Sequence, residues 1–251
     1  MDGIALKTPA ELEIMRKAGR IVAGLLKLLE KEACPGVSTL RLDEIAEEFI
    51  RSRGAEPAFK GYYGFPASIC ASVNEEVVHG IPGSRILKEG DVAGIDVGVK
   101  LQGFYSDAAR TFAIGRVDVA SQKLIDVTRE AMIAGIAQAV AGARLSDISW
   151  AVQSAAESKG FSVVRQFVGH GIGKNLHEEP QVPNYGKPGR GPVLRVGMAL
   201  AIEPMLNAGS HEVEILKDGW TVVTKDRKRS GHFEQTIFVG ENKAEIVTEN
   251  A

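Results

Sequence analysis

The sequence has little of several features that would assign it to a particular class of protein. Only two of its 251 residues are cysteine, Cys34 and Cys70, too few for a disulfide framework or a zinc ribbon, so we expect reduced thiols in the cytoplasm. The net charge of −2 gives no electrostatic attraction to nucleic acid or to an anionic membrane. No apolar run approaches the ~20 residues of a membrane span, and the N-terminal segment lacks a signal-peptide core. An ordinary globular composition remains, with 44% hydrophobic residues.

Five polar side chains nevertheless lie in separate apolar stretches. A carboxylate in an apolar, strand-like segment is costly to bury unless a cation neutralises it. Four carboxylates and one imidazole suit a pair of divalent cations, and the single nitrogen makes the two positions unequal. The pattern therefore predicts one buried cationic centre. Its candidate ligands are Asp96 in GIDVGV, Asp107 in FYSDAARTF, His170 in FVGHGIG, Glu203 in MALAIEPM and Glu234 in GHFEQTIFV.

Two of these acids belong to a predicted β-hairpin from Asp91 to Phe112. Apolar and polar residues alternate from Ile95 to Lys100, and a turn is expected near Leu101-Gln102-Gly103. If the turn is symmetric about its first two residues, Asp96 lies directly across from Asp107, and a slip of two positions still keeps both on one face. Opposed side chains have Cβ atoms ~5 Å apart, so two carboxylates there repel each other unless a cation lies between them.

The remaining sequence predicts helices and strands in two similar halves. A capping box of Thr8 and Glu11, with Pro9 at the first helical position, begins the first helix, which ends at Cys34-Pro35-Gly36. Further elements are expected as helices over Leu40–Arg53, over Gln122–Ala141 and from an N-cap at Ser146 to Gly160, and as an irregular excursion over Pro180–Pro192. Because the order helix, helix, strands occurs twice, the pattern favours an α+β architecture in two halves.

Patterns typical of several other enzyme classes are absent or incomplete. The HEEP sequence that begins at His177 lacks the second histidine of the zincin motif, and there is no GxSxG elbow, P-loop or strand–GxGxxG–helix unit. A catalytic dyad of Cys70 with His79 or with His170 stays open, although Cys70 in SICAS fits an apolar wall better. Metal-dependent chemistry is therefore the leading hypothesis.

Taken together, the motifs resemble those of the type I methionine aminopeptidases, in the bacterial form. The matching stretches are GYYGFPASICASVNEEVVHGIP, GDVAGIDVGVKLQGFYSDAARTF, GFSVVRQFVGHGIGKNLHEEPQVPNYG, GMALAIEPM and DGWTVVTKDRKRSGHFEQTI. The five ligands alone indicate the wider superfamily that includes prolidase and aminopeptidase P. The resemblance implies the α+β pita-bread fold, with helices outside a curved antiparallel sheet in two pseudo-symmetric halves, as one catalytic domain over residues 1–251.

The resemblance also implies a role for each ligand. Two divalent cations, of cobalt, manganese, iron or zinc, would be bound by the five residues, and a bridging water or hydroxide would be the nucleophile. Asp96 would chelate one metal, Asp107 and Glu234 would bridge both, and His170 and Glu203 would complete the other. Glu203 would also shuttle a proton from the water toward the leaving amine.

Residues around the ligands acquire substrate-binding roles from the same resemblance. His177 would hydrogen-bond the oxygen of the scissile carbonyl group, and His79 would contact the peptide near the departing nitrogen. The pocket for the methionine thioether would be apolar and polarisable. It would be formed by Tyr62, Phe65, Cys70 and Trp220, with His79 at its edge. A closed pocket would also select substrates with a small second residue.

The sequence departs from the family pattern at three positions. Leu176 stands where some relatives have an aromatic residue, and Gly98 stands where a polar residue sometimes occurs. Gln235 follows the last ligand in FEQT, where FEHT is typical. Because a changed neighbour of a metal ligand costs ~10–100-fold in metal affinity or activity, we expect Gln235 to bear on metal preference.

The expected function is removal of the initiator methionine from nascent chains. The protein is expected to be a monomer that contacts the ribosome transiently, with neither a nucleic-acid site nor a membrane contact. Two alternatives stay open. One is an aminopeptidase of another N-terminal specificity, such as Xaa-Pro, and the other is a non-catalytic protein that binds nascent chains on the same fold.

Overall fold

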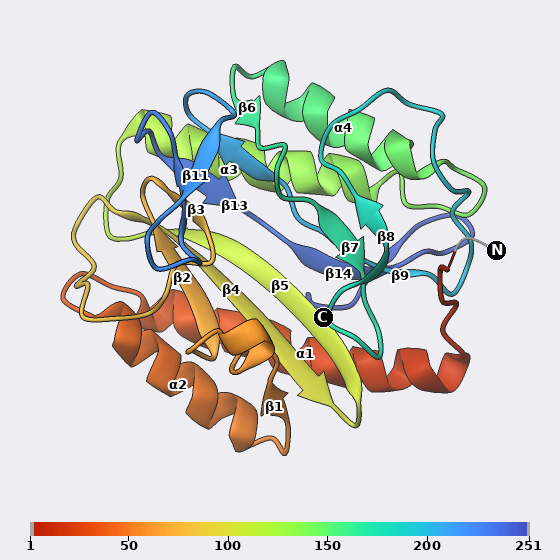
Figure 1. Cartoon of the computed structure of the whole chain (residues 1–251), viewed down its shortest axis with the longest axis horizontal. Coiled ribbons are helices and arrows are strands. Elements are labelled where there is room, and N and C mark those ends of the chain that lie inside the picture. Colours follow the sequence, from red (N-terminus) through yellow and green to blue (C-terminus); the bar gives the residue numbers. More distant parts are fainter. Residues whose placement is uncertain (1–2, 250–251) are drawn as a thin grey trace.

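The computed structural model describes residues 3–249, in which two pairs of α-helices enclose layers of antiparallel strands. Figure 1 shows α1 and α2, in red and orange, on one side of the strands, and α3 and α4, in green, on the other. Each pair of helices precedes a group of strands along the chain, so the predicted α+β architecture in two similar halves is confirmed. No helix among the described residues is long and apolar enough to cross a membrane.

The first half begins with α1 (Pro9–Glu32) and α2 (Thr39–Arg51). The predicted capping box is present, since the Thr8 hydroxyl accepts a hydrogen bond from Glu11 N and the Glu11 carboxylate accepts one from Thr8 N. The apolar faces of both helices pack on the strands of this half and form its core. Burial of this face, rather than helix propensity alone, stabilises both helices.

The predicted hairpin consists of β4 (Val92–Leu101) and β5 (Phe104–Ala113). Its turn is Gln102-Gly103, and both residues have positive φ, of 50° and 82°, as tight hairpin turns require. The expected register was wrong by two positions, because Asp96 pairs with Ala109 and Asp107 pairs with Gly98. The shift of two keeps both acids on the same face. The other strands of this half are β1 (Glu56–Pro57), β2 (Ile69–Val73) and β3 (Glu76–Val78), with a short 3₁₀ turn, η1 (Tyr62–Gly64).

The second half begins with α3 (Val119–Ile136) and α4 (Leu145–Glu157), whose bounds differ from the prediction. The Asp118 side chain caps α3 by accepting from Ser121 N, so this helix starts before Gln122. The predicted N-cap at Ser146 was wrong, because α4 begins at Leu145 and its N-cap is Arg144. Ser146 lies inside the first turn, where its hydroxyl accepts a hydrogen bond from Arg190 N of a distant loop.

Short antiparallel strands complete the second half. They are β6 (Ser162–Val163), β7 (Gly169–Gly171), β8 (Glu178–Val182), β9 (Ala199–Ile202), β10 (Met205–Asn207), β11 (Val213–Ile215), β12 (Val222–Thr224), β13 (Ser230–His232), β14 (Gln235–Phe238) and β15 (Glu245–Ile246). The largest sheet has the order β15-β14-β9-β7-β8. α3 and α4 pack on it and form a second core.

A seam between β5 and the segment that leads into β14 joins the two halves. Ala109 and Glu234 exchange backbone hydrogen bonds of 3.3 and 2.9 Å. On either side of this pair, Thr111 Oγ1 donates to His232 O, and Asp107 N donates to Thr236 Oγ1. The seam brings residues that are far apart in the sequence to the same place.

Candidate active site

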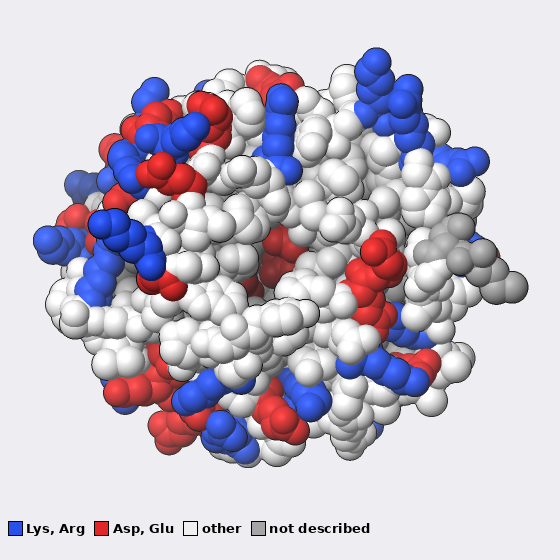
Figure 2. Space-filling model, in the orientation of Figure 1, with Lys and Arg blue, Asp and Glu red and all other residues white. Residues whose placement is uncertain are grey.

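One cavity, of about 220 Å³, contains every residue that the sequence predicted for the site. Figure 2 shows the hollow near the middle of one face, with acidic side chains visible inside it. Its walls are mainly aromatic and apolar. Its lining comprises Phe59, Tyr62, Tyr63, Phe65, Cys70, His79, Asp96, Asp107, His170, Leu176, His177, Glu203, Trp220 and Glu234.

The five predicted ligands reach the cavity from separate strands of both halves. Asp96 is in β4, Asp107 in β5 and His170 in β7, while Glu203 follows β9 and Glu234 precedes β14. Potential ligand atoms of Asp107, His170 and Glu234, all buried, lie within 4.8 Å of one another. His170 Nε2 lies 3.6 Å from Asp107 Oδ2, 3.5 Å from Glu203 Oε1 and 4.0 Å from Glu234 Oε1.

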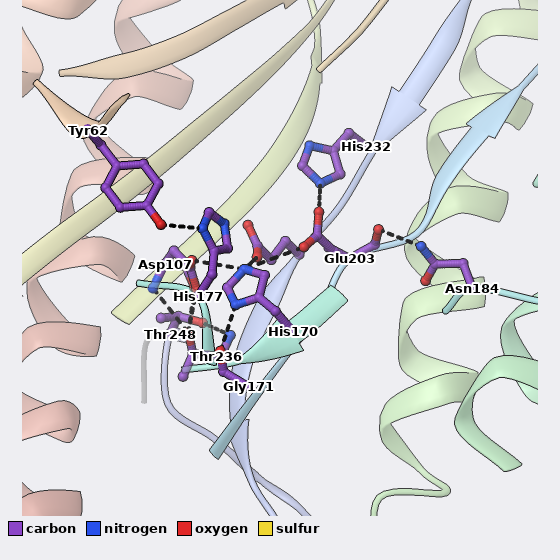
Figure 3. Close-up of polar contacts among 11 residues, drawn as sticks. Tyr62, Asp107, His170, Gly171, His177, Asn184, Glu203, His232, Thr236 and Thr248 are labelled. Carbon is purple, nitrogen blue, oxygen red and sulfur yellow. Dashed lines mark hydrogen bonds and ion pairs between the residues drawn. The ribbon is translucent and has the colours of Figure 1, made fainter. Parts of the chain in front are cut away.

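Hydrogen bonds to the backbone and to a threonine orient these ligands. His170 Nδ1 lies 2.9 Å from the backbone oxygen of Gly171. Because a carbonyl oxygen can only accept, the ring hydrogen of a neutral His170 lies on Nδ1, and the lone pair of Nε2 faces the carboxylates. The Thr236 hydroxyl lies 2.9 Å from Asp107 Oδ1 and can donate to it. Figure 3 shows the Asp107 and Glu203 carboxylates directed at the His170 ring. A lone pair that faces carboxylate oxygens is repulsive without a cation and is suited to a metal ion.

The electrostatics of the cluster also favour a bound cation. Burial is the largest cause that raises the pKa of Asp96, Asp107, Glu203 and Glu234 above the usual carboxyl range, and repulsion by Asp107 adds to it at the other three. No lysine or arginine within residues 3–249 lines the cavity to neutralise them. Asp96 Oδ1 is buried and has no hydrogen-bond partner within residues 3–249. The donor set therefore fits divalent cations.

His232 belongs to the same cluster and was missed by the sequence analysis. Its ring is 4% exposed, and its Nε2 lies 3.6 Å from Glu203 Oε2, the oxygen that His170 does not approach (Figure 3). The sequence does hold a signal that could have identified His232. It lies two residues before Glu234, and residues two apart in an extended segment point to the same face.

Asn184 is a second residue that the sequence analysis missed. It is 1% exposed, and its Nδ2 donates a 3.1 Å hydrogen bond to the backbone oxygen of Glu203, just before Pro204. The predicted irregular excursion over Pro180–Pro192, which begins inside β8, is thereby tied to the site. No pattern in the sequence indicates this contact.

Aromatic rings and a thiol form the apolar wall of the cavity. Phe65 and Trp220 meet edge to face, with centroids 5.1 Å apart, and Cys70 packs with them. Burial raises the pKa of the Cys70 thiol well above its usual value, and its contact with His79 is to the backbone of that residue. A nucleophilic dyad needs a thiolate beside an imidazole, so the geometry does not support the cysteine alternative.

Two further histidines, His79 and His177, line the cavity. The His79 ring lies edge-on to Phe167 and to Trp220, with centroid distances of 5.6 and 6.5 Å. The His177 ring lies 4.3 Å from that of His170, and its Nδ1 is 2.8 Å from Tyr62 Oη. Burial lowers the pKa of both His79 and His177 to about 4, so both rings are neutral near pH 7.

The three departures from the family pattern have different structural settings. Leu176 is buried in the cavity wall. A Cβ at Gly98 would lie 2.5 Å from the Phe59 ring, so glycine makes room for an aromatic residue of the cavity. Gln235 lines a different hollow from its neighbour Glu234 and accepts a hydrogen bond from the Thr248 hydroxyl. Thr248 in turn accepts a hydrogen bond from Thr236 N, which connects Gln235 to the residue that contacts Asp107.

Comparisons with known proteins agree with this geometry. Residues 13–241 match the model of metallopeptidase family M24. The chain is 56% identical to a methionine aminopeptidase of Clostridium perfringens, over 98% of each protein. It is 55% identical to methionine aminopeptidase 1 of Bacillus subtilis, over 98% of this chain and 99% of that protein.

Solved structures extend the likeness to the whole fold. The methionine aminopeptidase of Thermotoga maritima has a TM-score of 0.97 at 48% identity, over 98% of this chain and all of that one. Prolidase from Pyrococcus furiosus shares the fold alone, with a TM-score of 0.80 at 22% identity, over 98% of this chain and 66% of its own. The predicted pita-bread fold is confirmed, and the chain belongs to metallopeptidase family M24 and, within it, to the methionine aminopeptidases.

Proposed function

We propose that this chain is a metal-dependent aminopeptidase that removes the N-terminal methionine from newly made proteins and peptides. The observation that carries the proposal is a buried cluster of carboxylates and histidine that shares one cavity with an apolar pocket of aromatic and sulfur side chains. The names of the relatives at about 55% identity over nearly their whole length support it. The substrates would be the N-termini of nascent chains in the cytoplasm, reached through transient contact with the ribosome.

The ligand cluster would hold two divalent cations. Oxygen-rich sites with one imidazole accept cobalt, manganese, iron or zinc. When bound, such cations polarise a carbonyl group and lower the pKa of water. The residues that would hold them are Asp96, Asp107, His170, Glu203 and Glu234.

Side chains of the protein would perform the remaining steps of peptide hydrolysis. The Glu203 carboxylate, held between His170 and His232, would take a proton from the attacking water and pass it to the leaving amine. His177 would donate a hydrogen bond to the carbonyl oxygen as negative charge develops on it. His79, which lines the same cavity, would contact the departing nitrogen.

The shape of the cavity would set the preference for methionine. Phe65, Cys70 and Trp220 offer a soft apolar wall that suits an unbranched thioether, and Tyr62 lines the same cavity. The cavity has a volume of only about 220 Å³, and a small second residue would be preferred for lack of space beside the scissile bond.

A peptide panel on metal-stripped and metal-reconstituted protein tests the proposal. We expect Met-Ala-Ser to be cleaved only after reconstitution, Met-Leu-Ser much more slowly, and Ala-Pro not at all. Cleavage of Ala-Pro in preference to Met-Ala-Ser would replace the proposal by the Xaa-Pro specificity. Full metal occupancy without cleavage of any peptide would favour a non-catalytic binding protein.

A further inference from the structure

One hydrogen bond links the wall of the substrate pocket to a histidine of the proposed chemistry. Tyr62 Oη lies 2.8 Å from His177 Nδ1, and Figure 3 shows the phenol directed at that nitrogen. The other ring nitrogen, Nε2, has no hydrogen bond within residues 3–249, and His177 lines the cavity. The phenol therefore occupies one nitrogen and leaves the other for a ligand.

The direction of this hydrogen bond decides which nitrogen carries the ring hydrogen. A phenol is a good donor, and an unprotonated imidazole nitrogen is a better acceptor than a phenol oxygen. With Oη as the donor, Nδ1 accepts, and the single ring hydrogen of the neutral imidazole must lie on Nε2. The reverse direction would leave Nε2 without a hydrogen, and His177 could then not donate to a carbonyl oxygen.

We propose that Tyr62 is a positioning residue that holds His177 as the Nε2–H tautomer, so that the ring donates to the carbonyl oxygen of the substrate. The inference rests on the proposed aminopeptidase function. Tyr62 acts through His177 and does not itself need to touch the reacting atoms.

The turn that carries Tyr62 connects this role to recognition of the substrate side chain. Backbone hydrogen bonds close the turn, from Tyr62 N to Phe59 O at 2.9 Å, from Phe65 N to Tyr62 O at 2.9 Å and from Gly61 N to Phe65 O at 2.8 Å. Phe65 of the same turn packs against Trp220 in the pocket wall. A side chain that displaced the turn would thus disturb both the pocket and the His177 donor, so a poor fit would lower kcat as well as binding.

The test compares Tyr62→Phe with a matched control, Tyr185→Phe, which removes a phenol hydroxyl from an exposed ring beside Arg165. Long-range ¹H–¹⁵N NMR of histidine-labelled, zinc-loaded protein reads the tautomer of His177. We expect the Nε2–H pattern in the wild type and in the control, and a mixture of tautomers in Tyr62→Phe. For Met-Ala-Ser, kcat of Tyr62→Phe should fall about tenfold with KM little changed, whereas the control should match the wild type.

Two results would overturn the inference. One is an unaltered Nε2–H signal in Tyr62→Phe together with unaltered kcat, and the other is a rise in KM alone, which would make Tyr62 only a pocket wall. Were the wild type itself inactive with metal bound, the proposed function would fail. The NMR comparison would still decide whether the phenol sets the tautomer.

Discussion

The two halves of the molecule supply the candidate site in different ways. The first half brings Asp96 and Asp107 on one hairpin of two ten-residue strands. The second half brings His170, Glu203 and Glu234 from the region of β7, β9 and β14, which are only three or four residues long. A long hairpin places its side chains by local periodicity, whereas short strands depend on the packing around them. One half of the site is therefore largely local in origin, and the other half is tertiary.

The seam between the halves holds the tertiary part of the candidate site in place. Glu234 exchanges backbone hydrogen bonds with Ala109 of β5, so the first half directly places a candidate ligand of the second. Thr236 in turn contacts the Asp107 carboxylate. The site belongs to neither half alone.

The largest expected effect comes from removing one acid of each half. Asp107→Asn and Glu234→Gln should each reduce turnover of a methionine peptide to background, because both are buried beside His170 and neither amide can replace a carboxylate ligand. Peptide hydrolysis and bound metal per chain are the measurements. Near-wild-type turnover of either variant after reconstitution would contradict a site shared between the halves.

The next largest expected effect is a loss of turnover on substitution of His232, a residue of the candidate site that comes from the second half. His232→Gln should lower kcat ~10–100-fold through its contact with Glu203, with the fold retained. His211→Gln, in the same half but outside the cavity lining, is the matched control and should leave kcat unchanged. Equal kcat values for the two variants would show that His232 has no role in the site.

Core truncations compare the stability of the halves. Ile95→Ala in the first core and Ile237→Ala in the second, both 0% exposed, should each cost ~2–5 kcal/mol of unfolding free energy. If residues 1–251 form one domain, as predicted, both variants shift a single urea transition. Two transitions, each moved by only one variant, would show that the halves unfold separately.

The last expected effect is on the pH dependence of the metal-stripped protein. Burial raises the folded-state pKa of Asp96, Asp107, Glu203 and Glu234, so their contribution to stability is complete below the usual carboxyl pKa and is lost as pH rises through the raised values. The Tm of the stripped protein should therefore be lower at pH 8 than at pH 5, and zinc should reverse the fall at pH 8. A Tm that rises with pH in the absence of metal would contradict this account.

The contrast between local and tertiary origin also explains what the sequence could predict. Alternation in the hairpin places Asp96 and Asp107 on one face, but the register depends on the Gln102-Gly103 turn, whose two positive φ angles the alternation does not reveal. The apolar segments around Glu203 and Glu234 made both candidate ligands, and the family resemblance gave them different roles.

Other features of the site arise only from long-range contacts. The bond from Asn184 to Glu203, the approach of His232 and the phenol of Tyr62 on His177 join segments that no sequence period relates. The Ser146 hydroxyl was likewise predicted as a cap and was instead taken by Arg190 N. Predictions from local sequence fail at these residues because a partner that is distant in the sequence binds the polar group.

The position of the seam has a consequence during synthesis of the chain. Glu234 is placed by pairing with Ala109 of β5, which precedes it in the sequence by more than a hundred residues. A growing chain thus carries Asp96 and Asp107 long before it carries the candidate ligand Glu234. The proposed centre would be complete only after the segment that contains Glu234 has been synthesised and has docked on β5.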